Sequence, residues 1–369
     1  DMMVVLKKLA ADGLVQRYVE TNSPRDRWEL TPIGSIVLTD AKADTQSRII
    51  RYAIAIQKSE SNYSASTRIM GDVSCIELGK STSKMIQSIP KISIKPGYRP
   101  QSDDKTPEAD AIDFYLLRQL TNSQRWQMGA KLNRWAKTVS LRGMKKACPS
   151  TYKERFARSI LGSKWLPILT PTSEPSMWTQ DPSEIARLLH PIFETLGVSY
   201  YITGGVAASA YGDPRTTRDL DLVIELLRDN IFQLVEALET AGFYCPPGSV
   251  KDIQEGRGMV LSVTHMTSVL NADIVLNSHT EFDRSKMARR RLEALDEAGV
   301  EQFWIASPED IVLAKLLWRQ QSKSQKQWND VLGILKVQSE NLDRCYLTEW
   351  AKQLGLIDDL NLACTEAGI

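Results

Sequence analysis

The sequence of 369 residues predicts an α+β protein, with a mixed-sheet core followed by a helical bundle at the C-terminus. Three observations lead to this prediction. From Asp181 onward, short apolar stretches of strand character alternate with segments of helical spacing. From about residue 301 the pattern is mainly helical. Residues 107–165 repeat apolar side chains at helical spacing and are rich in lysine and arginine, which predicts a basic helical module before the core.

The composition is that of an ordinary soluble protein, with 42% hydrophobic and 25% charged residues. No stretch of about 18 apolar residues occurs, so we expect no membrane-spanning helix and no membrane partner. The five cysteines are scattered without a CxxC or Cys/His cluster, which argues against a zinc site and a disulfide framework. We therefore expect a cytoplasmic protein. The sequence starts at Asp1 rather than at Met, which is compatible with a fragment or a processed form.

Residues 1–40 predict a helix that ends at Gly13, a β-hairpin, and the start of a second helix. The hairpin strands are expected at Leu14–Val19 and Arg27–Leu30. The stretches LKKLAADGLVQRYV and DRWELTPIG resemble the end of a winged helix-turn-helix domain of the MarR or PadR kind, without the two helices that should precede them. The alternative is a small partner-binding hairpin. Residues 41–106, with clusters of Ser, Lys, Asn and Pro, predict a flexible linker.

The basic module carries a concentrated positive charge. Between Arg118 and Lys164 there are twelve lysines and arginines and one acid, Glu154, so this segment is about +11 and the rest of the chain about −10. Such a block predicts a surface for RNA or DNA, or else one that docks on the acidic remainder of the chain. Trp126 and Trp135 lie on different helix faces, so we expect at least one in the core, while the other could stack on a base. The candidate nucleic-acid contacts are Arg134, Arg142, Lys145 and Lys146.

The core is expected in residues 181–300 and the helical C-terminal region in 301–369. Strands are predicted at Tyr200–Thr203, Leu220–Leu226, Met259–His265 and Asn271–Leu276. Helices are predicted at Pro182–Leu196, Val206–Tyr211, Asp229–Ala241, Ser307–Arg319, Gln325–Val337 and Tyr346–Leu354.

Two aspartates lie two residues apart at the start of a predicted strand. Because successive side chains of a strand alternate, Asp219 and Asp221 share one face, while Leu220 points to the other. Adjacent carboxylates repel each other and need a counter-charge. A divalent cation such as Mg²⁺ or Mn²⁺ would supply it, since these ions prefer carboxylate oxygens. The structural alternative is an ion pair with Arg215 or Arg218.

Gly204 and Gly205 stand between a predicted strand and a predicted helix, where backbone amides can approach a phosphate. Thirteen residues separate them from Asp-Leu-Asp at 219–221. This order resembles the signature of the DNA polymerase β-type nucleotidyltransferase superfamily. The resemblance covers about residues 182–336 and is strongest to uncharacterised bacterial nucleotidyltransferases, with a more distant likeness to toxins of toxin–antitoxin pairs.

The resemblance implies an NTP substrate, Mg²⁺ or Mn²⁺ as cofactor, and a third carboxylate on a later strand, for which the stretch LNADIVLN offers Asp273. The implied catalytic metal ligands are Asp219, Asp221 and Asp273. The residues assigned to nucleotide binding are Gly204, Gly205, Arg218 and Lys315. Asp330 resembles an acid that orients the pair of C-terminal helices in such proteins.

These features favour an enzyme that transfers a nucleotide from an NTP to an acceptor hydroxyl, on RNA or on a protein. A second hypothesis is a catalytically inactive nucleic-acid-binding regulator or an antitoxin-like protein, which the N-terminal segment and the basic module favour. A third is modification of a small molecule, which would call for an acidic acceptor cleft. An antitoxin or a second copy of the chain is an expected partner under the toxin-like resemblance. The acceptor, the preferred NTP and the oligomeric state are left open by these residues.

Overall fold

The computed structural model describes residues 15–18, 27–30, 92–161, 175–294 and 300–369. The chain divides into two compact units, Asp1–Lys91 and Ile92–Ile369. In the first unit, β1 (Val15–Tyr18) pairs antiparallel with β2 (Arg27–Leu30), which confirms the predicted hairpin. The helices on either side of it lie outside the described residues, so the winged helix stays a prediction. Every helix of the described ranges is too short or too polar to cross a bilayer.

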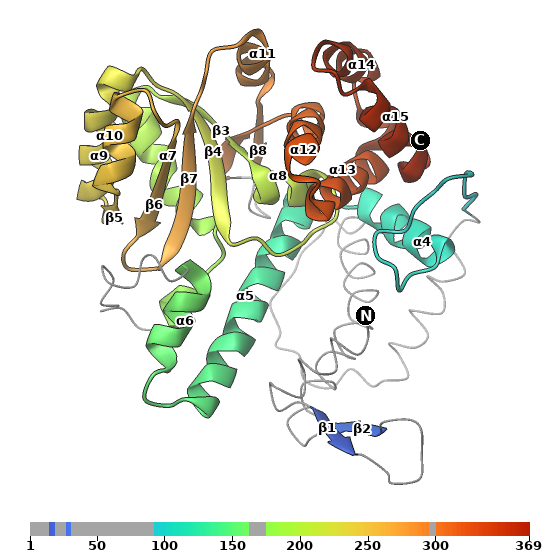
Figure 1. Cartoon of the computed structure of the whole chain (residues 1–369), viewed down its shortest axis with the longest axis horizontal. Coiled ribbons are helices and arrows are strands. Elements are labelled where there is room, and N and C mark those ends of the chain that lie inside the picture. The colour runs from blue at the N-terminus through green and yellow to red at the C-terminus, as the bar shows by residue number, and fades with distance from the viewer. Residues whose placement is uncertain (1–14, 19–26, 31–91, 162–174, 295–299) are drawn as a thin grey trace, which may run out of the picture. The chain divides into compact units, whose positions relative to one another are not determined.

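In the described part of the second unit, seven strands form one mixed sheet in the order β5-β6-β7-β4-β3-β9-β8 (Figure 1). The central strand β4 pairs parallel with β7 and antiparallel with β3. The pair of β3 and β9 is also parallel, and the remaining neighbours are antiparallel. The bounds are Ser199–Thr203 (β3), Asp219–Glu225 (β4), Phe243–Tyr244 (β5), Val260–His265 (β6), Leu270–Leu276 (β7), Arg291–Ala294 (β8) and Gln302–Ile305 (β9). The four predicted strands are confirmed, and β5, β8 and β9 are additions.

One face of the sheet is covered by three helices, α7 (Glu184–Leu196), α9 (Ile231–Thr240) and α10 (Pro247–Gln254). Leu220 and Leu222 of β4 are at most 1% exposed and belong to the main hydrophobic core. The alternate residues Asp219, Asp221 and Val223 of β4 are half-buried, and Glu225 at its end is exposed. The period-two pattern in the sequence therefore separates a core face from a polar face of the sheet, as predicted.

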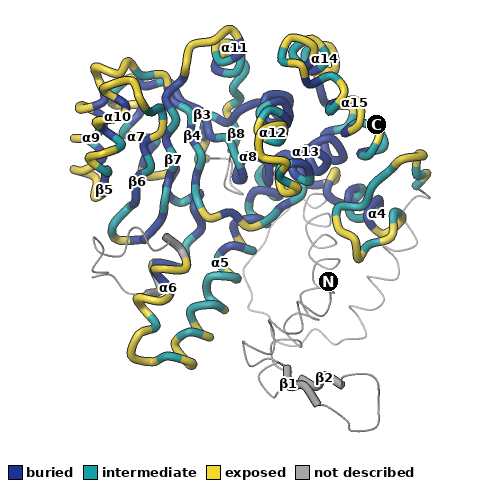
Figure 2. The backbone as a smooth tube through the Cα atoms, viewed as in Figure 1, coloured by how far each residue is buried: buried dark blue, intermediate teal, exposed yellow. Residues whose placement is uncertain are grey.

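The polar face is flanked by two helices of the core region and four helices of the C-terminal region. They are α8 (Gly204–Tyr211), α11 (Glu281–Arg289), α12 (Pro308–Ser322), α13 (Gln325–Gln338), α14 (Arg344–Gln353) and α15 (Ile357–Ala367). Helix α12 begins at a capping residue, because the Ser307 side chain accepts a hydrogen bond from the Asp310 N–H at 3.2 Å. Helix α13 is largely buried and packs against α8, α12 and α15. Figure 2 shows this burial as a continuous dark region through the central strands and α13.

The basic module consists of α4 (Pro107–Arg118), α5 (Asn122–Ala147) and α6 (Tyr152–Leu161), followed by the 3-10 turn η2 (Pro175–Thr179). Helix α5 packs along α8 and η2, so the module belongs to the same compact unit as the sheet. A capping box at Thr121 starts this helix.

Residues 92–106, the described part of the range 41–106, open the second unit and pack against its C-terminal helices. The Arg99 N–H donates to the Glu366 carbonyl at 2.9 Å, and the Gln101 side chain donates to the Asn329 carbonyl at 2.7 Å. Where the sequence composition predicts a flexible linker, this stretch is therefore held against α13 and α15. The Ser- and Pro-rich composition gives no sign of these partners, because they lie more than 200 positions away in the sequence.

Candidate active site

The register of the sheet brings the three predicted carboxylates together. Asp221 of β4 stands directly beside Asp273 of the parallel strand β7, and Asp219 stands beside Asn271. Residues paired in this way point to the same face of a sheet, so Asp219, Asp221 and Asp273 lie on the polar face. All three are half-buried. The prediction that Asp273 accompanies the pair thus agrees with the observed strand order.

The electrostatics of this group are unfavourable without a cation. The pKa of Asp221 is raised to about 6, first by burial and then by the negative charges of Asp219 and Asp273. A hydrogen bond from the Gly205 N–H and the charge of Lys315 act in the opposite direction. A cation bound between the carboxylates would relieve this repulsion, so the charge of the group fits a divalent ion.

The side chains of the group are turned toward protein donors. The Ser262 hydroxyl donates to Asp273 at 2.6 Å, and the Gly205 N–H donates to Asp221 at 3.4 Å. As they stand, no three acidic, His or Cys side chains of the described residues are grouped closely enough to hold a metal ion. The backbone positions and the charge fit a metal, whereas the carboxylate oxygens do not converge on one point in this arrangement.

The Gly204-Gly205 turn lies against the acids. Gly204 adopts a left-handed φ of +65°, and a Cβ atom at this position would collide with the carboxylate of Asp221. A Cβ at Gly205 would lie 2.7 Å from the Thr217 hydroxyl and 3.2 Å from a guanidinium nitrogen of Arg215. Both glycines are therefore required by close approach of the backbone to polar side chains of the site.

We expect Gly204→Ala to lower the free energy of unfolding by about 1–2 kcal/mol through backbone strain, and to weaken Mg²⁺ binding by displacing Asp221. The matched control is Gly248→Ala in α10, where a Cβ meets nothing within 4 Å and the φ is ordinary. Chemical denaturation and a Mg²⁺ titration would measure both effects. Equal stability of the two variants would show that the glycine is not required by the turn.

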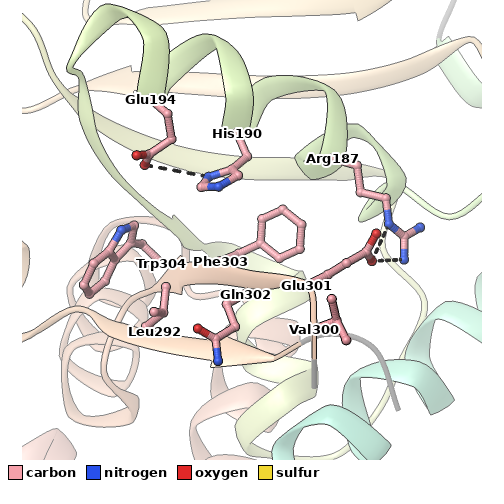
Figure 3. Close-up of a pocket in the computed structure, with 9 residues that line it drawn as sticks. All are labelled: Arg187, His190, Glu194, Leu292, Val300, Glu301, Gln302, Phe303 and Trp304. Atoms are coloured by element: carbon pink, nitrogen blue, oxygen red, sulfur yellow. Dashed lines mark hydrogen bonds and ion pairs between the residues drawn. The ribbon is translucent and has the colours of Figure 1, made fainter. Parts of the chain in front are cut away.

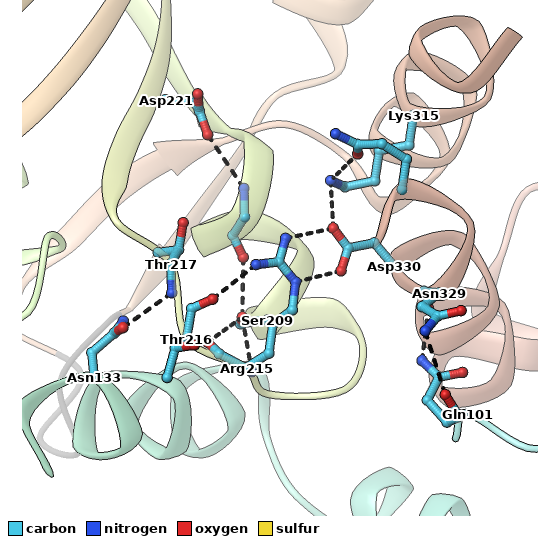
Figure 4. Close-up of polar contacts among 12 residues, drawn as sticks. Gln101, Asn133, Ser209, Arg215, Thr216, Thr217, Asp221, Lys315, Asn329 and Asp330 are labelled. Carbon is cyan, nitrogen blue, oxygen red and sulfur yellow. Dashed lines mark hydrogen bonds and ion pairs between the residues drawn. The ribbon is translucent and has the colours of Figure 1, made fainter. Parts of the chain in front are cut away.

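A network of two cations and one acid, in which Lys315 and Asp330 are buried and Arg215 is half-buried, joins the turn to the C-terminal helices (Figure 4). Arg215 donates two hydrogen bonds to Asp330 of α13, at 2.5 and 2.6 Å. The Lys315 ammonium of α12 lies 2.7 Å from the same carboxylate and donates to Gln327 at 2.8 Å. Burial lowers the pKa of Lys315, while Asp330 and Asp221 oppose that shift. Burial raises the pKa of Asp330, but Arg215 and Lys315 together lower it below its usual range.

The network affects the charge of the whole site. Arg215 and Lys315 exceed Asp330 by one positive charge, and Lys315 interacts electrostatically with Asp221. With every group ionised, the three strand carboxylates and this network sum to −2, which is the charge of one divalent cation with opposite sign.

The structure distinguishes the two arginines before Asp219. Arg218, assigned to nucleotide binding, is exposed and makes no hydrogen bond or ion pair with any described residue. Arg215, weighed in the sequence only as a structural counter-charge, is the one that forms the network. Their side chains cannot be told apart from sequence, because the loop between α8 and β4 has no regular alternation.

A cavity of the described residues lies apart from these groups. It has a volume of about 490 Å³ and is formed by α7, β9 and neighbouring residues (Figure 3). Its lining includes Arg187, His190, Glu301 and Phe303. None of the residues assigned to metal or nucleotide binding lines this cavity, and an ion pair of 2.6 Å between Arg187 and Glu301 occupies one end of it. The candidate active site is therefore identified here by its charged groups and not by this cavity.

The four predicted nucleic-acid contacts have different environments. Arg134 lies 3.5 Å from Glu184 of α7 and is half-buried. Arg142, Lys145 and Lys146 are exposed at the C-terminal end of α5. The two tryptophans also differ as expected, since Trp126 is 4% exposed and Trp135 is 46% exposed.

Comparison with known proteins gives little further information. No protein-family model and no curated protein matches this chain. A solved structure similar to part of it is that of an antigenic nucleotidyltransferase-like protein from Paracoccidioides brasiliensis, with 20% sequence identity and a TM-score of 0.34. The similarity covers 51% of this chain and 94% of that chain. At this identity and TM-score the likeness assigns no function to this chain.

Proposed function

We propose that this protein transfers a nucleotide from an NTP to an acceptor hydroxyl in a metal-dependent reaction. The observation that carries the proposal is the register of Asp221 with Asp273, which sets three carboxylates on one face beside the Gly-Gly turn. A divalent metal, Mg²⁺ or Mn²⁺, would neutralise the triphosphate and favour ionisation of the acceptor hydroxyl. The acceptor oxygen would form a bond to the α-phosphorus of the NTP. The bond between the α-phosphorus and the oxygen that bridges it to the β-phosphate would break, and pyrophosphate and the proton of the hydroxyl would be released.

The residues of the chain have separate tasks in this proposal. Asp219, Asp221 and Asp273 would hold the metal. The N-terminus of α8, which begins at Gly204, lies beside Asp221 and offers backbone amides to the phosphates. Lys315 contributes positive charge behind Asp221, and Asp330 with Arg215 keeps it in place.

The direct test is to incubate the full chain with each labelled NTP, Mg²⁺ and total RNA, and to follow the label into RNA, protein or a small product. Label transfer that requires metal supports the proposal. Absence of both NTP binding and transfer, with nucleic-acid binding retained, would favour the inactive regulator, which the exposed cations of α5 also allow.

We expect Lys315→Met to reduce kcat/KM for the NTP about 10- to 100-fold, because a positive charge near the phosphates is lost. The fold should persist, since Asp330 keeps its two hydrogen bonds from Arg215. Steady-state kinetics and NTP titration would measure the change. Wild-type NTP affinity combined with a lower melting temperature would mean that Lys315 only joins α12 to α13.

A further inference from the structure

An exposed stripe runs along one face of α5. Its members are Lys131, Trp135, Val139, Arg142 and Lys146, all exposed. Their separations of four, four, three and four residues place them on one side of the helix. Figure 2 shows the exposed residues gathering on the part of α5 near α6. The stripe therefore presents cations, a tryptophan and a valine together to solvent.

The opposite face of α5 fixes the helix on the domain. Trp126 is buried in the main core, and Asn133 is 4% exposed. Two cations of α5 that precede Arg142 in the sequence form hydrogen bonds within the chain. Arg125 donates to the Ala210 carbonyl at 2.8 Å, and Lys137 donates to the Gln180 carbonyl at 2.7 Å. The positive charge of the proximal part of the module is thus used for docking, whereas Arg142 and Lys146 have no partner among the described residues.

The chemistry of the stripe fits a nucleic acid. The 26 residues of α5 contain no Asp or Glu, so nothing on this helix neutralises its cations. Lys145 and Lys153 are exposed nearby and extend the positive surface to α6. A tryptophan with 46% exposure within such a surface can stack on an unpaired base, while the flanking cations contact phosphates.

The face of α5 opposite the stripe is linked to the candidate active site. On the inner face of the same helix, the Asn133 side-chain oxygen accepts from the Thr217 N–H at 3.0 Å. The Thr217 hydroxyl is in turn 3.5 Å from a carboxylate oxygen of Asp219. The middle of α5 is therefore two hydrogen bonds away from the proposed metal ligands, as Figure 4 shows for Asn133 and Thr217.

We propose that this stripe binds the phosphodiester chain of a single-stranded nucleic acid and guides its end to Asp219, Asp221 and Asp273 as the acceptor. The acceptor role rests on the proposed nucleotidyl transfer, whereas the binding does not. Trp135 stacks on a base, and Arg142 and Lys146 contact phosphates. Arg134, which faces Glu184, is not part of this surface.

The test uses the full chain and a fluorescent oligouridylate long enough to follow α5, about 39 Å from its 26 residues. Arg142→Glu/Lys146→Glu should weaken binding at least tenfold and make the dependence of log K on log salt less steep by about 1.4, for two phosphate contacts. Trp135→Ala should weaken binding about 5- to 100-fold without changing the salt dependence, and Trp135→Phe should retain most of the wild-type affinity. The control, Lys251→Glu/Lys352→Glu, makes the same charge change on exposed residues of α10 and α14.

Equal effects of the control and the Arg142/Lys146 pair would overturn the proposal, since they would reflect net charge alone. The proposal would also be overturned if Trp135→Ala bound the oligouridylate as tightly as the wild-type protein does. The same holds if the wild-type protein preferred an acidic peptide to the oligouridylate. Failure of the proposed nucleotidyl transfer would look different. In that case Asp221→Asn and the wild type would process NTP equally poorly, while the oligouridylate results would be unaffected.

Discussion

Asp221→Asn should lower nucleotidyl transfer by at least about a thousandfold, because under the proposed mechanism a cation held by the three carboxylates would contribute several kcal/mol to the transition state. Asparagine has nearly the shape of aspartate but carries no charge, so the sheet register with Asp273 should persist. The same substitution at Asp219 is expected to have a similar effect. Transfer assays at saturating Mg²⁺, with the exposed Asp229→Asn as the matched carboxylate control, would measure the loss.

The Asp221→Asn variant should be more stable than the wild type in the absence of metal. The folded pKa of Asp221, about 6, lies above its ordinary value of 3.8, so the folded state holds its proton more tightly than the unfolded state. The free energy of unfolding therefore falls as pH rises from about 4 to 6, and it stays lower at neutral pH. Removing this charge should raise the free energy of unfolding by about 2–3 kcal/mol at pH 7.

Metal should reverse this order of stability. Mg²⁺ is expected to raise the melting temperature of the wild type and not that of Asp221→Asn, and its affinity should weaken as the pH falls through about 6. A variant that is inactive but less stable than the wild type without metal would contradict the electrostatic account. Wild-type turnover in both the Asp219 and the Asp221 variant would remove the catalytic assignment itself.

The sequence was sufficient for the part of the site that follows strand periodicity. The alternation through Leu220 and Leu222 predicts a strand with two acids on its other face, and LNADIVLN repeats that pattern around Asp273. Both strands are present, and they are neighbours. The exact partner of each acid could not be predicted, because strand order and register depend on contacts between residues about 50 positions apart.

The parts that sequence reasoning missed have weak local signals. Strands β8 and β9 have four residues each, which is too few for a clear periodicity. Their antiparallel pairing with each other becomes visible only in the folded sheet. The role of Arg215 depends on Asp330, 115 positions away. Lys336 of α13 has the sequence character of a solvated lysine, yet its side chain is 0% exposed. Such residues become recognisable only when the helices that surround them are in place.

Loss of one member of the buried pair Asp110–Lys336 should cause the largest fall in stability. Their charged atoms lie 2.7 Å apart, and both side chains are 0% exposed. Lys336 also donates to the Arg99 carbonyl, and Asp110 accepts from the Tyr98 hydroxyl at 2.7 Å and from the Gln101 N–H at 2.9 Å. The pair thus joins α4, α13 and the stretch 92–106 in one polar network inside the domain.

Lys336→Met is expected to lower the free energy of unfolding by about 3–5 kcal/mol, because it leaves the Asp110 carboxylate buried without its cation. Asp110→Asn should cost a similar amount, and the double variant should cost clearly less than the sum of the two, since no charge is then left unpaired. The control is Lys105→Met, which removes a surface pair with Asp113 at 2.8 Å whose side chains are 29% and 34% exposed, and it should cost under about 1 kcal/mol. Denaturant titrations of the four variants and the wild type would give these values. Additive losses in the double variant, or a loss for Lys336→Met no larger than for Lys105→Met, would show that the buried pair is not what holds α4 against α13.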